Sequence, residues 1–300
     1  MNVGQLAALA CLWEVSASKP GNVHRAADFD DLTFVDFATS AVAIIPALDA
    51  AAAGARLGET VLRAVRATRE AVATNTNLGT VLLMSPLAMA AGEPLREGVS
   101  RVLRSLDKED VRLVYEAIRL AGPGGMDRVE EADIQGEPPD DLLHAMRLAA
   151  DRDLVARQYV NGFAEIFDVA LPALAEGQGC GWPLGHAIVH AQMRLMSEYP
   201  DSLVARKCGA AVARQSAAMA GAVIAAGLPG DVAYENALAD FDFWLRSDGH
   251  RRNPGTTADL LAASLFAALV SGAIALPARF YRSQARRTEN KAPLLPKLIP

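Results

Sequence analysis

Apolar residues recur at helical spacing along most of the chain. The clearest case runs from Val3 to Ser16, where Leu6, Leu9 and Trp13 fall on one face of a helix. No stretch alternates apolar and polar residues for long enough to predict a sheet. The pattern therefore predicts an all-α fold.

Further apolar segments separated by short polar loops predict more helices. We expect them at about residues 34–53, 58–74, 81–91, 95–105, 108–120, 183–198, 203–228 and 231–245, with one or two more over 142–171. Pro46 should kink the first of these, and Pro172 should stop the segment that ends at 171. Pro200, Asp201 and Ser202 should cap the segment that starts at 203.

These helices predict a single globular domain over residues 1–282, followed by a basic and flexible tail at 283–300. The Gly- and Pro-rich segment 121–140 is read as a long loop within that domain. Residues 260–278 carry no charge and approach the length of a membrane span. Because this stretch is Ala-rich and closely flanked by Asp259 and Arg279, we predict a buried core helix and no membrane partner.

Composition restricts the function. The 300 residues are 51% hydrophobic and carry a formal net charge of −6, which provides no general attraction to nucleic acid or anionic membranes. Cys11, Cys180 and Cys208 lack the spacing of a disulfide framework or a zinc site, which favours the cytoplasm. An anion site must therefore be a local cluster of basic groups.

Polar loops precede several of the predicted helices. Unpaired backbone N–H groups and the helix dipole favour an anion at such helix starts. The strongest case is segment 250–259, where Arg251 precedes Gly255, Thr256 and Thr257. Gly255 lets the backbone approach a ligand closely, and the arginine offers a guanidinium fork. The alternative is an ordinary capped helix beside a solvated loop.

Two other loops carry similar residues. In the first, Lys19 and Arg25 suit phosphate, and Asp31 with its neighbouring aspartates could hold Mg²⁺, which takes one or two carboxylates plus substrate phosphates. In the second, Asn75 and Thr76 could face a ligand. Both loops could equally be plain turns.

Basic and metal-type side chains also occur within predicted helices. Arg206 and Lys207 fall in the first turn of the predicted helix 203–228, where cations oppose the dipole, so an anion is expected nearby. The run 151–153, Asp-Arg-Asp, fits a structural ion pair as well as a metal site. His186 and His190 share a helix face, but the zinc-protease pattern fails at Ala187.

Together these segments resemble the triphosphoribosyl-dephospho-CoA synthase family. Four short motifs occur in the family's order along most of the chain. They are Glu14-Val15 with Lys19-Pro20-Gly21, Arg25 and then Asp31; Asn75-Thr76 with Gly79; Leu203-Val204-Ala205-Arg206; and Pro254-Gly255 with Ala258-Asp259-Leu260-Leu261.

The resemblance implies an all-α transferase that uses ATP. It would move the triphosphoribosyl group of ATP to the 2′-hydroxyl of 3′-dephospho-CoA and release adenine, which makes a prosthetic-group precursor. The hydroxyl would attack C1′ of the ATP ribose through an oxocarbenium-like transition state. Positioning and fixed charge would then supply most of the catalysis.

The resemblance also implies roles for individual residues. Glu14 or Asp259 would steady positive charge or take a proton, and Asp31 would help to place Mg²⁺. The residues implied to hold the nucleotide and its phosphates are Lys19, Gly21, Arg25, Asn75, Thr76, Gly79, Arg206, Lys207, Arg251, Asn253, Gly255 and Thr256. From the residues alone, Asp259 could instead form a capping box with Thr256, and Glu14 could be a surface residue.

The chain departs from the family pattern at two short motifs and in the Gly- and Pro-rich segment 121–140. Asn77-Leu78 stands where the family has His-Lys, and Arg157-Gln158 stands where it has Gly-Glu. These departures indicate a divergent member and leave two other functions open. One is a nucleotide-dependent transferase with another cofactor precursor, for example in methanopterin-linked one-carbon metabolism. The other is a non-catalytic nucleotide-binding accessory protein. Small-molecule nucleotides are the expected partners, and the Ala-rich segment 210–228 leaves a homodimer open.

Overall fold

The structure, a computed structural model, describes residues 1–122 and 134–281. Within these ranges the chain forms helices, together with one short extended segment, β1 (Ser247–His250). The predicted all-α fold is therefore confirmed. The tail predicted at 283–300 and most of the loop predicted at 121–140 lie outside the described residues.

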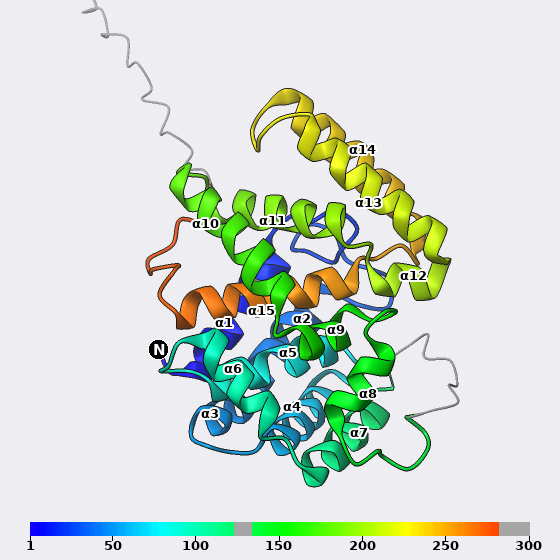
Figure 1. Ribbon diagram of the computed structural model, residues 1–300. Helices are drawn as coiled ribbons and strands as arrows, with labels where there is room; N and C mark the ends of the chain where they lie inside the picture. Colours follow the sequence, from blue (N-terminus) through cyan, green and yellow to red (C-terminus); the bar gives the residue numbers. More distant parts are fainter. Residues whose placement is uncertain (123–133, 282–300) are drawn as a thin grey trace, which may run out of the picture.

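The apolar helix α15 (Gly255–Val270) runs through the middle of the molecule (Figure 1). Every residue from Leu260 to Leu269 on it is buried. It packs against α1 (Val3–Ser16), α5 (Leu78–Met89) and α11 (Leu184–Glu198). The prediction of a buried core helix is confirmed as far as Val270, where the helix ends.

The first half of the chain packs around one side of α15. The predicted helix at 34–53 is divided at Ile44, and Pro46 lies in the first turn of the second piece, where its missing N–H costs nothing. The other helices of this half follow the predicted segments closely. Their bounds are α2 (Phe34–Ala43), α3 (Ile45–Ala52), α4 (Leu57–Val72), α6 (Leu95–Arg104) and α7 (Lys108–Ala121).

The second half contains more breaks than predicted. The segment 142–171 forms three pieces, and Pro172 opens a further helix instead of stopping one. The elements are α8 (Leu142–Ala149), α9 (Leu154–Asn161), the π-helix η1 (Glu165–Ala170), α10 (Leu171–Gly179), α12 (Ser202–Cys208), α13 (Ala210–Ala225) and α14 (Val232–Arg246). Figure 1 shows α13 and α14 side by side at the edge of the molecule.

The prediction of a single helix over 203–228 is wrong, because the segment forms two helices, and this changes the position of two cations in their helix. Gly209 adopts a φ of 91°, which is open to glycine and separates α12 from α13. Arg206 and Lys207 consequently lie in the last turn of α12, where the helix dipole favours cations. Their position therefore requires no nearby anion, contrary to the prediction.

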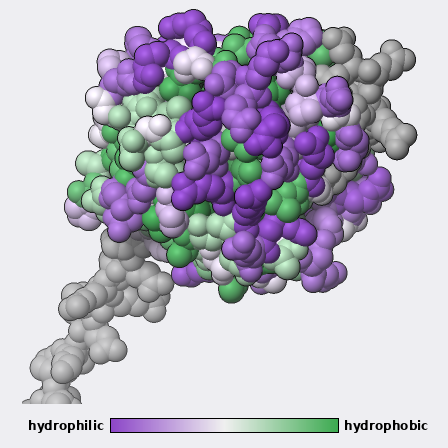
Figure 2. All heavy atoms as spheres, turned by 90° about the horizontal axis from the view of Figure 1, so that it is seen from below, coloured by the Kyte–Doolittle hydropathy of each residue, from purple (hydrophilic) through white to green (hydrophobic). Residues whose placement is uncertain are grey.

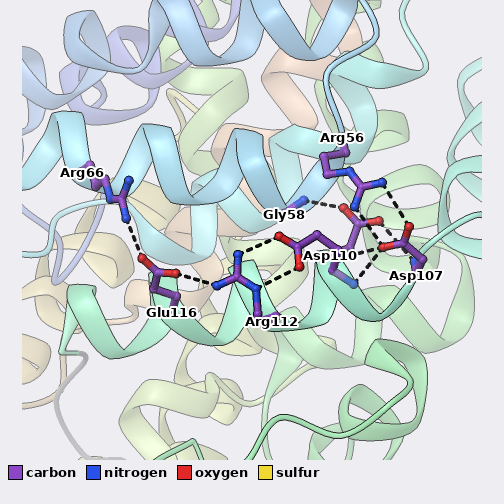
Figure 3. Close-up of polar contacts among 8 residues, drawn as sticks. Arg56, Gly58, Arg66, Asp107, Asp110, Arg112 and Glu116 are labelled. Carbon is purple, nitrogen blue, oxygen red and sulfur yellow. Dashed lines mark hydrogen bonds and ion pairs between the residues drawn. The ribbon is translucent and has the colours of Figure 1, made fainter.

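Charged side chains connect α4 and α7 along their length (Figure 3). Asp107 caps α7 and pairs with Arg56, while Glu116 pairs with Arg66 and Arg112. Asp110 differs from these because it is only 4% exposed, and it accepts the N–H of Gly58 at 2.9 Å. The exposed pairs contribute little to stability, whereas the buried bond ties the starts of both helices together.

Much of the outer surface is polar. The lower end of the molecule in Figure 1, turned toward the viewer in Figure 2, is mainly hydrophilic with smaller hydrophobic areas.

By length and composition alone, the stretch Phe34–Ala52 is apolar enough to cross a membrane. One such stretch is weak evidence, and here it is broken into α2 and α3, which pack against α1 and α4.

We expect Asp110→Ala to destabilise the protein by about 2 kcal/mol, because it leaves the buried N–H of Gly58 without its acceptor and removes the capping-box partner of Asp107. Urea unfolding measures the change. Glu116→Gln is the matched control in the same helix, and its exposed ion pairs should be worth only about 0.5 kcal/mol. Equal effects of the two substitutions would contradict this assignment.

Candidate functional site

A cavity of about 790 Å³ lies between the two halves of the chain. Its walls come from α1, α2, α5, α7, α8, α9, α12 and α15 and from the loops before α5 and α15. Segments far apart in the sequence thus share one space. Ten residues predicted for the site line it: Glu14, Asn75, Thr76, Gly79, Arg206, Lys207, Asn253, Gly255, Thr256 and Asp259.

The buried carboxylate of Asp201 joins two of the helix starts at the cavity. It accepts the N–H groups of Leu203 and Val204 at 2.8 and 3.0 Å, which caps α12 as predicted. Its other oxygen accepts the N–H and the hydroxyl of Thr257, at 2.7 and 2.8 Å, at the start of α15. Burial raises the pKa of Asp201, and these bonds oppose the rise.

The start of α9 is joined to the same point. The hydroxyl of Ser202 donates to Thr256 at 3.0 Å and accepts the N–H of Leu154 at 3.2 Å. The starts of α9, α12 and α15 therefore meet at one wall, which directs their positive dipole ends to a common region.

The loop that contains Gly21 is fastened from several sides. Gly21 has a φ of 72° and donates its N–H to Asp242 at 2.8 Å, and a Cβ there would lie 2.7 Å from Leu245. Asn22 bonds to Gln192 at 2.9 Å and to Asn253 at 2.7 Å. Gly21 is thus needed for the turn itself and does not line the cavity, whereas Asn22 does.

Glu14 stands at the cavity wall and forms an ion pair of 2.9 Å with Lys19. The Lys19 side chain has no exposed surface and is not part of the lining, so the structure does not bring it to the cavity as a phosphate ligand. Burial raises the pKa of Glu14, and the charge and hydrogen bond of Lys19 partly offset that rise. Glu14 is therefore not the surface residue of the alternative interpretation.

Asp259 is the second carboxylate at the wall. It accepts the hydroxyl of Thr80 at 2.6 Å, across from α15 to α5. Removal from water raises the pKa of Asp259 to about 7, and the negative charges of Glu14 and Asp201 add to the rise. The capping box with Thr256 does not form, because no side chain caps α15 and Asp259 is turned toward α5.

Cations gather along the more exposed part of the lining. Arg206 is ion-paired with Asp153, the residue that caps α9, and Lys207 follows it. Arg119 and Arg152 also line the cavity, although no motif singled them out as anion ligands. Arg152 directly precedes the helix cap Asp153, which was the one local signal that could have pointed to it.

Besides Lys19, four residues predicted for the site do not line the cavity. Arg25 is exposed with its guanidinium over the ring of Tyr281, and Arg251 donates to the carbonyl of Lys207 at 3.1 Å. Gly21 serves the turn described above. Asp31 is 68% exposed and lies 3.6 Å from His250.

These placements bear on the predicted metal ligands. Asp31 does not line the cavity, although its neighbour Leu32 does, because the Asp31 side chain is exposed and lies near His250. Over residues 1–122 and 134–281, no three His, Cys, Asp or Glu side chains are grouped so that they could hold a metal ion. His190 packs between the rings of Trp182 and Tyr234.

The loop before α5 is held by its own polar side chains. Asn75 accepts the N–H of Leu78 at 3.1 Å, and Thr76 donates to Ser40 of α2 at 2.6 Å. Asn77, one of the departures from the family pattern, is buried and bonded to Thr68 of α4. It therefore holds the loop in place where the family carries a titratable group.

The other departure lies beside a carboxylate that the motifs did not indicate. Gln158 donates to the buried Glu165 at 2.6 Å, and Arg157 pairs with the same carboxylate at 2.8 Å. Asn161 adds a third bond at 2.7 Å. Glu165 belongs to η1 and is absent from the cavity lining, so this cluster fixes the π-helix.

Comparison with known proteins agrees with the motifs. Residues 1–276 match the family CitG, described as ATP:dephospho-CoA triphosphoribosyl transferase. A relative from Azotobacter vinelandii, named probable 2-(5''-triphosphoribosyl)-3'-dephosphocoenzyme-A synthase, is 28% identical over 195 residues. That alignment covers 64% of this chain and 59% of the relative, so the chain spans less than two thirds of the relative's length.

A solved structure gives the same result at the level of the fold. It is the crystal structure of a protein from Archaeoglobus fulgidus with the provisional name triphosphoribosyl-dephospho-CoA synthase. The two chains share 32% identity and a TM-score of 0.61, over 78% of this chain and 98% of the other. The resemblance drawn from the four motifs is thereby confirmed, while the roles of single residues stay predictions.

We expect Gly79→Ala to disturb the cavity wall, because the added Cβ would lie 2.2 Å from an oxygen of Asp259. A forced shift of this kind costs about 1–3 kcal/mol. Gly179→Ala in α10 is the control, since nothing lies within 4 Å of its added Cβ and alanine favours a helix. Thermal unfolding compares the two, and equal stability would contradict the described contact.

We expect Asp259→Asn to stabilise the protein by an amount that grows with pH. The pKa of Asp259 is about 7 in the folded protein against an ordinary value of 3.8, so the folded state binds more protons than the unfolded chain between these values. Wild-type stability therefore falls as pH rises through this window and levels off above about 7. Urea unfolding from pH 4 to 8 measures the difference, and a difference independent of pH would contradict the shift.

Proposed function

This chain belongs to the ATP:dephospho-CoA triphosphoribosyl transferase family, and we propose that it transfers the triphosphoribosyl group of ATP to the 2′-hydroxyl of 3′-dephospho-CoA. In this reaction the hydroxyl oxygen bonds to C1′ of the ATP ribose as the bond from C1′ to adenine breaks. The hydroxyl gives up a proton, and adenine leaves with the electron pair and takes up a proton. The observation that carries the proposal is one cavity with cations on its exposed wall and two carboxylates further inside.

The cationic wall suits the triphosphate. Arg152, Arg206 and Lys207 would hold the phosphate oxygens together with the N–H of Thr256 at the start of α15, because the N–H of Gly255 is already donated to Asn253. Because Asp153 already pairs with the charge of Arg206, the side chains of Arg152 and Lys207 are the stronger candidates for binding phosphate. Asn75 and Thr76 would border the nucleotide from the loop before α5.

The two carboxylates suit the reacting centre. A carboxylate beside C1′ steadies the positive charge of an oxocarbenium-like transition state, and a protonated one can give a proton to the departing base. Glu14 is paired with Lys19, whereas no cation is bonded to Asp259 among the described residues. Asp259, with a pKa of about 7, is therefore the proposed proton donor, and Glu14 is the proposed acceptor.

Magnesium is proposed to enter as part of the substrate MgATP. Each cavity carboxylate is already bonded: Glu14 to Lys19, Asp153 to Arg206 and Asp259 to Thr80. The triphosphate would thus supply most of the metal's ligands, in line with the coordination that Mg²⁺ prefers. The three cysteines are unpaired, which supports a reducing cytoplasm as the compartment.

Adenine release tests the proposal directly. Purified protein with MgATP should release adenine only when 3′-dephospho-CoA is present, and the second product should carry the added triphosphoribosyl mass. Release that needs a different hydroxyl-bearing cofactor precursor would support the transferase with another acceptor. Bound ATP without any release would contradict catalysis and favour the accessory role.

Substitution of two cations that line the cavity tests where the triphosphate binds. We expect Arg152→Met and Lys207→Met each to raise KM for ATP by roughly 10-fold or more, because a charge-assisted bond to phosphate contributes about 1.5–3 kcal/mol. Arg104→Met is the control, since Arg104 is exposed on α6 and does not line the cavity. An unchanged KM in both cavity variants would place the triphosphate elsewhere.

A further inference from the structure

Lys19 is exceptional among the basic residues of the molecule. Of the lysines and arginines in the two described ranges, it alone is buried. Its side chain has no exposed surface, although the cavity lies next to its partner. A buried ammonium is costly unless a counter-charge is close, so its position needs a specific explanation.

Among the described residues, Lys19 forms an ion pair only with Glu14, at 2.9 Å. The attraction between the two opposite charges is the larger part of the effect of Lys19 on Glu14, and the hydrogen bond between them is the smaller part. Glu14 in turn is on the cavity lining while Lys19 is not. The carboxylate thus reaches the cavity, and the ammonium does not.

The segment that follows Lys19 is fixed by contacts with two helices and with the loop before α15. Gln192 of α11 donates to the carbonyl of Pro20 at 3.2 Å, and Asp242 of α14 accepts the N–H of Gly21. Arg246 of α14 donates to the carbonyl of Asn22 at 2.7 Å, and Asn253 before α15 bonds the side chain of Asn22. These bonds hold the backbone from Pro20 to Asn22 in place directly after the lysine, whose own side chain is paired with Glu14.

The charges that face this pair come from several elements. The charge of Lys19 lowers the pKa of Glu14. The charge of Glu14 in turn raises the pKa of Cys11 in the same helix and of Asp259 in α15. His24 is within the influence of Lys19: burial, with the charges of Arg246 and Lys19, lowers the pKa of His24 to about 4. His24 is therefore neutral near pH 7 and adds no second positive charge near Lys19, whose counter-charge is Glu14.

We propose that Lys19 is a positioning residue that keeps the Glu14 carboxylate ionised and fixed at the cavity wall, where it accepts the proton of the acceptor hydroxyl. This inference rests on the proposed transfer reaction and changes the role that the motif implied for Lys19. The proton passes from the 2′-hydroxyl to Glu14 while the oxygen bonds to C1′. Lys19 itself contacts neither substrate.

Kinetics of Lys19→Met distinguish positioning from phosphate binding. We expect kcat at pH 7 to fall by about 100-fold or more, the range for loss of a general base, with KM for ATP changed less than about 3-fold. Without the lysine charge the pKa of Glu14 rises, so the acid limb of the pH profile should move to higher pH. Lys19→Arg should restore much of the rate.

Lys207→Met is the matched comparison, because its effect is expected on KM for ATP. A large rise in KM with kcat retained in Lys19→Met would overturn the proposal and make Lys19 a phosphate ligand. Met has a similar length and suits a buried site, and circular dichroism verifies folding. If Lys19→Met does not fold, Lys19→Arg decides alone, since a rise in KM for ATP at unchanged kcat in that variant also overturns the proposal.

Titration of Glu14 gives a readout that does not depend on turnover. Carbon-13 NMR of labelled glutamate carboxyls, with Glu14→Gln to identify the signal, should show a higher midpoint for Glu14 in Lys19→Met than in the wild type. An equal midpoint in both proteins would overturn the proposal. Absence of adenine release from the wild type would contradict the transfer reaction, while this titration would still test the pair.

Discussion

The architecture of the site depends on the bonds that Asp201 makes to two helix starts. One carboxylate oxygen caps α12, and the other binds Thr257 at the first turn of α15. Ser202 extends this connection to α9. Since a buried carboxylate is stable only when its oxygens are bonded, the three helices must approach in one arrangement. The cavity wall, and with it the spacing of the cations and carboxylates, follows from that arrangement.

The second organising feature is a separation of charge across the cavity. Arg119, Arg152, Arg206 and Lys207 occupy the more exposed lining, while Glu14 and Asp259 are shielded from bulk water. The two carboxylates have different neighbours, a lysine for one and a threonine hydroxyl for the other. Different neighbours favour different protonation states, which is the usual basis for dividing acid and base roles between two carboxyl groups.

Periodicity and breaker residues were sufficient to predict most of the fold. The first helix was expected at its observed bounds, and a buried core helix was expected over 260–278, where α15 covers Gly255–Val270, because propensity and burial agree there. The errors arose where a single residue acts through tertiary context. Gly209 was read as one residue of a long helix, and Pro172 as a stop, yet the first adopts a positive φ and the second opens α10. Both residues permit either outcome locally.

The site could be predicted in part for a similar reason. Residues in the four motifs converge on the cavity, but a motif does not tell which side chain faces it. Lys19 and Glu14 belong to the same motif, and only packing shows that the carboxylate is at the wall and the lysine is not. Arg119 and Arg152 reach the cavity from α7 and from the turn before α9. No local pattern separates Arg119 from surface arginines, and the cap residue Asp153 is the one local signal beside Arg152.

A crystal structure with bound ATP, in the absence of the acceptor, tests the central claim most directly. The account predicts the triphosphate against Arg152, Arg206, Lys207 and the start of α15, with the ribose near Glu14 and Asp259. A nucleotide whose phosphates contact Arg25 or Arg251 outside the cavity, with Glu14 and Asp259 remote from the ribose, would contradict it.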